Sequence, residues 1–134
     1  MQAQVNYYAV AAAVVLTQGL GALWYSRALF GKAWMAAVGK SEEDLKEGGM
    51  AVPFIGAILL SLVMAVVLAH LVAHMEEKTL VSGIQAACWV WAGFIATTMG
   101  VNHLFQGSPL RLYLIDSGYH LGSLMIMGAV FGAW

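Results

Sequence analysis

Long uncharged apolar runs are separated by short polar breaks along this chain. Residues 1–26, 48–75, 79–110 and 117–134 contain no Asp, Glu, Lys or Arg. A helix needs about 20 mostly apolar residues to cross the hydrocarbon core of a bilayer. Glu76-Glu77-Lys78 separates two of these runs, and Pro109 interrupts the third, because proline cannot continue a helix. The pattern predicts four transmembrane helices at about 5–25, 52–74, 80–104 and 112–134.

The segment 27–50 is the one substantial polar loop. Apolar residues recur at helical spacing from Leu29 to Val38, which predicts a short helix lying in the interface of the membrane. Ser41 is followed by three acidic residues, the signature of a helix N-cap with acids in the first turn. We therefore expect a second short helix, ending near Gly48-Gly49.

Composition supports a membrane protein. Hydrophobic residues make up 61% of the 134 positions and charged residues 10%, whereas soluble domains carry about 25% charged residues. A soluble enzyme or a disordered regulator is disfavoured, and the net charge of −1 offers no basic surplus for nucleic acid. The single cysteine, Cys88, excludes an internal disulfide. We expect an all-α integral membrane bundle forming one domain over 1–134, with its first helix retained rather than cleaved as a signal peptide.

Basic residues near span ends indicate orientation, because cytoplasmic loops are enriched in Lys and Arg. Five of the six lie in the first or third loop, and one lies in the second. The loop 27–50 is therefore predicted to be cytoplasmic in the cell membrane, with both termini outside. The five are Arg27, Lys32, Lys40, Lys46 and Arg111, and the sixth is Lys78.

Small residues recur at four-residue spacing, which allows helices in lipid to approach closely. The second predicted helix carries Ala57, Ser61, Ala65, Ala69 and Ala73. The fourth carries two glycine pairs, at 118 and 122 and at 128 and 132. These stripes predict tight packing. Four spans of this length leave little internal space, so a homo-oligomer or a larger membrane complex is expected.

Polar side chains gather in the cytoplasmic half of the predicted bundle. Asp116 and His120 are four residues apart and share a helix face. A buried carboxylate needs a partner or must take up a proton, and for Asp116 the candidates are Asn102, His103, Arg27 and His120. Either a proton- or cation-handling site or a structural hydrogen-bond network fits. The candidate site residues are Asp116, His120, Asn102, His103, Tyr119, Arg27, Gln18 and Thr98.

His70 and His74 form a second pair at the other end of the bundle. They are weak metal candidates, because zinc sites use three or four protein ligands, and a polar rim is the favoured interpretation. No cofactor is expected. The sequence contains no nucleophile or phosphate-loop motif, so enzymatic activity is not favoured.

Two signatures resemble a bacterial membrane family known as domain of unknown function 1761. One comprises Gly-Ala-Leu-Trp-Tyr-Ser at 21–26 and the segment 29–35, and the other comprises 102–107 and 114–120, with a matching end at 127–134. The chain departs from the family at Arg27 and Ala33, where many relatives would have proline. The resemblance implies a four-helix membrane protein and no established activity or catalytic residue.

The sequence leaves the function open between classes. The favoured hypothesis is an oligomeric proton- or cation-coupled transporter or channel-like protein that uses Asp116 and His120. The alternative is an accessory or structural subunit of a larger membrane complex. A membrane enzyme acting on lipid ranks last.

Overall fold

The computed structural model describes residues 4–134, and this part of the chain is helical without strands. Four continuous helical stretches are long and apolar enough to cross a membrane, which confirms the predicted all-α class. They are α1 (Tyr7–Trp24), α4 (Ala51–Ala73), the stretch Leu80–Gln106 and α7 (Leu110–Ala133). Leu80–Gln106 comprises α5 (Leu80–Val90), the π-helical segment η1 (Trp91–Ala96) and α6 (Thr97–Gln106).

The loop after α1 contains α2 (Gly31–Val38) and α3 (Glu42–Glu47), near the two short helices expected there. Ser41 caps α3: its hydroxyl accepts from the backbone N–H of Asp44, whose side chain accepts from the N–H of Ser41. Gly39 ends α2 with a φ of 74°, a left-handed conformation that glycine adopts without strain.

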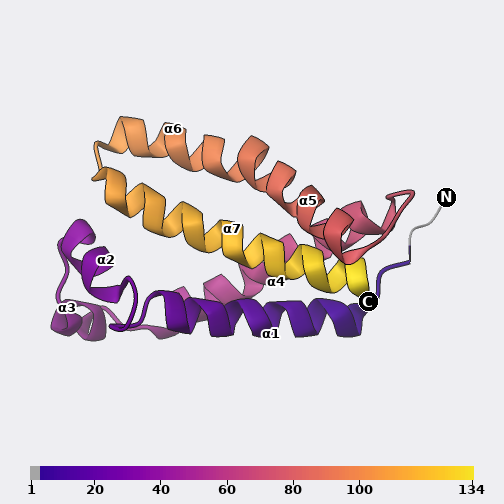
Figure 1. Cartoon of the computed structure of the whole chain (residues 1–134). Coiled ribbons are helices and arrows are strands. Elements are labelled where there is room, and N and C mark those ends of the chain that lie inside the picture. The colour runs from indigo at the N-terminus through magenta and orange to yellow at the C-terminus, as the bar shows by residue number, and fades with distance from the viewer. Residues whose placement is uncertain (1–3) are drawn as a thin grey trace.

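The long helices run up and down the bundle, and α7 contacts α1, α4 and α5 (Figure 1). The helices α2 and α3 gather at the same end as the turn between α6 and α7, while the described N-terminal residues and the C-terminus lie at the other end (Figure 1). The core between α1, α4, α5 and α7 is built from small and medium apolar side chains. Its most buried members include Val10, Ala13, Leu68, Leu124 and Met127.

Glycines permit the closest helix contact, between α5 and α7. A Cβ atom added to Gly83 would overlap the backbone of Gly128, and one added to Gly132 would overlap the carbonyl of Thr79. The other glycine pair of α7, at 118 and 122, packs against α1 instead. Gly118 faces the ring of Trp24, and the space beside Gly122 is filled by a side chain of α1. The predicted glycine pairs therefore lie at two different helix interfaces.

The alanine stripe of α4 is buried along only half of its length. Ala65 and Ala69 lie in the core, Ser61 and Ala73 are half-buried, and Ala57 is exposed. The first ten residues of α4 are almost all exposed, which leaves that part of the helix an apolar outer surface.

The third long helix differs from the expected regular α-helix. The π-helical segment η1 interrupts this helix, which extends to Gln106 rather than 104. The next helix, α7, begins at Leu110 rather than 112. Pro109 is the N-cap of α7, so the helix begins directly after it. The π segment is fastened at both ends: the indole of Trp91 donates to the carbonyl of Ser117, and the hydroxyl of Tyr113 donates to that of Ala96, each at 2.8 Å.

Candidate functional site

A tight turn after α1 directs Tyr25 towards α7. The backbone N–H of Phe30 donates to the carbonyl of Trp24 at 3.0 Å, and that of Gly31 to Ser26 at 2.9 Å. A Cβ atom on Gly31 would lie 2.5 Å from the carbonyl oxygen of Tyr25, so no larger residue fits without a backbone shift. The chain then enters α2, which packs against α7.

Asp116 accepts a hydrogen bond of 2.7 Å from the hydroxyl of Tyr25, and both side chains are half-buried. Tyr25 lies just beyond the end of α1. Within residues 4–134, no Lys, Arg or His nitrogen lies within 4.0 Å of the Asp116 carboxylate, so the expectation that His103 or His120 pairs with it is wrong.

Asp116 also lines a hollow of about 180 Å³ between α6 and α7, which we call the α6–α7 hollow. Two of the predicted site residues on α6, Asn102 and His103, line it as well. The complete lining is Met99, Asn102, His103, Gln106, Ser108, Leu112, Tyr113 and Asp116.

The ring of His103 is fixed on one wall of the hollow. Its Nδ1 lies 2.9 Å from the hydroxyl oxygen of Ser108. The ring stacks on Tyr113 with centroids 5.4 Å apart and planes inclined by 22°. Because the hydroxyl of Tyr113 is bonded to the carbonyl of Ala96, this pair of rings has a defined orientation.

Aromatic residues near Asp116 form contacts between α1 and α7. The hydroxyl of Tyr119 donates to the carbonyl of Thr17 at 3.1 Å, and its ring meets Tyr25 edge-on, with centroids 5.4 Å apart. His120 packs against Tyr119, with centroids 5.3 Å apart. The indole of Trp24 donates to the carbonyl of Ile115 at 3.0 Å.

Three predicted site residues lie elsewhere. Arg27 is exposed and forms an ion pair with Glu42, so the expectation that it partners Asp116 is wrong. The hydrogen bond from Arg27, together with its charge, lowers the pKa of Glu42. Gln18 donates to the hydroxyl of Ser61 at 3.1 Å, joining α1 to α4, and Thr98 is exposed and does not line the hollow.

Several residues around Asp116 and the hollow could not be predicted from the sequence. Tyr25 was not among the expected partners of Asp116, although it lies within the first signature segment. Gln106 and Ser108 lie close to Pro109, between the third and fourth long helices, where polar residues are ordinary. Helical periodicity does not show that the ring of Tyr113 stacks on His103.

The histidine pair of α4 is engaged with its own helix. Nδ1 of His70 lies 2.8 Å from the carbonyl of Val66, and Nδ1 of His74 lies 2.7 Å from that of His70. Across positions 4–134, no group of three or more His, Cys, Asp or Glu side chains is placed to hold a metal ion.

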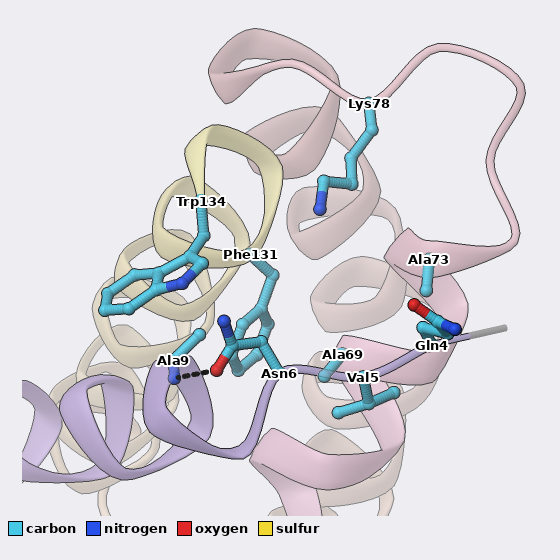
Figure 2. A pocket seen from close by; sticks show the side chains of 9 residues that line it. All are labelled: Gln4, Val5, Asn6, Ala9, Ala69, Ala73, Lys78, Phe131 and Trp134. Atoms are coloured by element: carbon cyan, nitrogen blue, oxygen red, sulfur yellow. Dashed lines mark hydrogen bonds between the residues drawn. The ribbon is translucent and has the colours of Figure 1, made fainter.

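A second, smaller hollow of about 50 Å³ lies at the opposite end of the bundle (Figure 2). Lys78, Phe131 and Trp134 are among the side chains around it. The side-chain oxygen of Asn6 accepts from the backbone N–H of Ala9 at 3.3 Å and caps α1 (Figure 2). This polar group therefore has a structural role.

The family model described as "Protein of unknown function (DUF1761)" matches residues 8–132. The chain belongs to the DUF1761 family. The match covers α1 to α7, so it includes both signature segments and every side chain of the α6–α7 hollow in this DUF1761 protein. No curated protein and no solved structure matches the chain.

Proposed function

We propose that this chain is a multi-pass protein of the cell membrane that works as a homo-oligomer and carries protons or another cation, with Asp116 as the group that binds them. The observation that supports this most strongly is a carboxylate on an apolar helix that lines an open hollow and has no basic partner within 4.0 Å among residues 4–134. Ionisable groups inside a span are costly, so they mark function or a tight network.

The hydrogen bonding of Asp116 favours exchange over a purely structural role. Tyr25 supplies one donor to Oδ1, and the carboxylate also borders the hollow. A single neutral donor offsets only part of the cost of removing a carboxylate from water. A proton or a cation arriving through the hollow would compensate the remaining charge. His120, one helical turn further along the same face, is the next group able to accept a proton.

The distribution of basic residues supports an orientation. The helices α2 and α3 and the α6–α7 turn share one end of the bundle (Figure 1), and five of the six Lys and Arg residues belong to these loops. By the positive-inside rule this end faces the cytoplasm, and both termini lie outside. Asp116 follows the start of α7 by six residues, which places it about 9 Å from the cytoplasmic end of that helix.

The outer surface of α4 supports contact with lipid and with further copies. Val52, Leu60 and Val63 are 82%, 72% and 60% exposed. A path across the membrane would be completed between copies or by helix movement. The same exposed apolar surface would also suit an accessory subunit of a larger membrane complex, which is the alternative function.

Reconstitution into liposomes containing a pH-sensitive dye tests the transport proposal. An imposed gradient is expected to drive proton or cation flux with the wild type, and Asp116→Asn should abolish it. Asp44→Asn is the matched control, because Asp44 is exposed on α3, away from the hollow. Absence of flux in the wild type, or equal flux in Asp116→Asn, would overturn the proposal. Stoichiometric partners in mild detergent, without flux, would favour the accessory subunit.

A further inference from the structure

We infer that the α6–α7 hollow binds a small organic cation of the alkylammonium or guanidinium class, rather than only a proton or a bare metal ion. This inference rests on the proposed function, because it names the kind of cation that the same site would take. It depends on the size of the hollow and on the mixture of side chains around it.

The size of the hollow exceeds what a single water or bare ion would fill. Its volume is about 180 Å³, and one water molecule needs roughly 10–15 Å³ by the same kind of measure. A proton-binding carboxylate needs no such space. The volume corresponds instead to a ligand with several non-hydrogen atoms.

The lining combines one negative charge with aromatic and apolar surface. Asp116 supplies the charge, and Tyr113 and His103 supply a stacked pair of rings. Cations bind to the faces of aromatic rings, most strongly where water is excluded. Met99 and Leu112 add apolar surface that alkyl groups would cover. An alkylated or planar cation can use all three kinds of contact at once.

The same lining is poorly suited to a metal ion. Calcium takes six to eight oxygen ligands and zinc takes four, including nitrogen or sulfur. The lining of the hollow includes one carboxylate and one imidazole, and that imidazole, His103, is engaged through Nδ1 with Ser108. Asn102 and Gln106 provide amide oxygens at the rim, which can accept hydrogen bonds from an ammonium or guanidinium group.

The recognising groups are held in place before a ligand arrives. Tyr25 fixes Asp116, Ser108 fixes His103, and the hydroxyl of Tyr113 is bonded to Ala96. A preorganised site loses less conformational entropy on binding.

Titration calorimetry of the full chain in detergent, with tetraethylammonium and guanidinium chlorides as probes, tests the inference. We expect saturable binding of at least one of the two probes that persists in excess sodium chloride. Asp116→Asn should weaken it about 30-fold or more, because the cation loses its only fixed counter-charge. Tyr113→Leu should weaken it as well, whereas Tyr113→Phe retains the ring and most of the affinity.

An exposed position at the rim provides a charge test that does not depend on buried substitutions. Gln106 is exposed, so Gln106→Glu and Gln106→Lys should both fold. The first should tighten binding and the second should weaken it, each by about two- to fivefold. Glu76→Gln, at the other end of the bundle, is the control and should leave affinity unchanged.

The outcomes separate this inference from the transport proposal. Probe binding that follows Asp116 and Gln106, without flux in liposomes, supports the ligand class and overturns transport. Flux that depends on Asp116, without binding of either probe, supports transport and overturns the organic cation. Binding that is insensitive to Asp116→Asn and to both Gln106 variants also overturns it, because the probes would then occupy another place.

Discussion

The hydroxyl of Tyr25 donates a 2.7 Å hydrogen bond to Oδ1 of Asp116, joining residues 91 positions apart in the sequence. Tyr25 is the C-cap residue directly after α1, and Asp116 lies about two turns into α7. The bond therefore ties the ends of two long helices together and fixes the orientation of a carboxylate that borders the α6–α7 hollow.

Removing the phenolic hydroxyl should weaken this connection measurably. Tyr25→Phe keeps the ring but removes the donor, and we expect a loss of about 1–2 kcal/mol in the free energy of unfolding, as for hydrogen bonds to charged groups and between membrane helices. A double-mutant cycle with Asp116→Asn, measured by detergent-induced unfolding, isolates the pair. Tyr8→Phe is the control, since Tyr8 is 83% exposed. Additive effects of the two substitutions would show that the residues are not coupled.

The close glycine contact between α5 and α7 predicts that even an alanine at position 83 lowers the stability of the protein. Gly83→Ala places a methyl group against the backbone of Gly128, so the helices must separate. Overpacking of this kind costs about 1–3 kcal/mol. Gly56→Ala is the matched control: no atom lies within 4 Å of its added Cβ, and alanine favours the helix. Equal thermal stability of the two variants would contradict the close contact.

Substitutions in the alanine stripe of α4 should affect stability differently at buried and at exposed positions. Ala65 is fully buried and Ala57 is exposed. Ala65→Leu should lower thermal stability by separating α4 from the core, whereas Ala57→Leu should be nearly neutral in detergent. If Ala57→Leu instead dissociates an oligomer while the fold survives, the exposed half of the stripe is the contact between copies. A neutral Ala65→Leu would count against the observed packing.

Most of the helical architecture could be predicted from where charges are absent. Burial of charged groups in lipid is so costly that the uncharged runs mark the long helices closely, and Ser41 and Pro109 mark where α3 and α7 begin. The π-helical segment could not be predicted, because the residues 91–96 are ordinary in an α-helix. Two hydrogen bonds between this segment and α7 hold it in place, from the indole of Trp91 and from the hydroxyl of Tyr113. Both depend on how the two helices pack.

The candidate site could be predicted only in part, for a related reason. Counting residues along the predicted helices indicates that Asn102, His103 and Asp116 lie at a similar depth in the membrane. The structure places all three around one hollow. Depth does not determine rotation about the helix axis or the path of a loop. Arg27 lies near the right level but pairs with Glu42, and Tyr25, which was not among the expected partners, donates the hydrogen bond to Asp116.

Acidification should loosen α3 before the long helices. The pKa of Glu42 is lowered by its hydrogen bond from Arg27, and that of Asp44 by bonds from the backbone and side chain of Ser41. A folded-state pKa below the unfolded value contributes stability at higher pH, and this contribution is lost as the pH falls through the lowered pKa. The protection factors of the amides in 42–47, taken relative to the intrinsic exchange rate at each pH, should therefore fall below about pH 4. Ser41→Ala should remove part of this response, and protection factors that stay constant on acidification would contradict it.

Access of a water-soluble reagent to position 116 is the property on which the proposed function depends. The most direct measurement is thiol labelling of Asp116→Cys in a Cys88→Ala background, using a membrane-impermeant cationic reagent on sealed vesicles of both orientations. Asp44→Cys serves as the accessible control, and Ala13→Cys, at a fully buried position, serves as the inaccessible one. We predict that positions 116 and 44 are both labelled from the cytoplasmic side only, while position 13 is not labelled. Labelling of position 44 but not of position 116, from either side, would contradict a carboxylate that receives cations through the α6–α7 hollow.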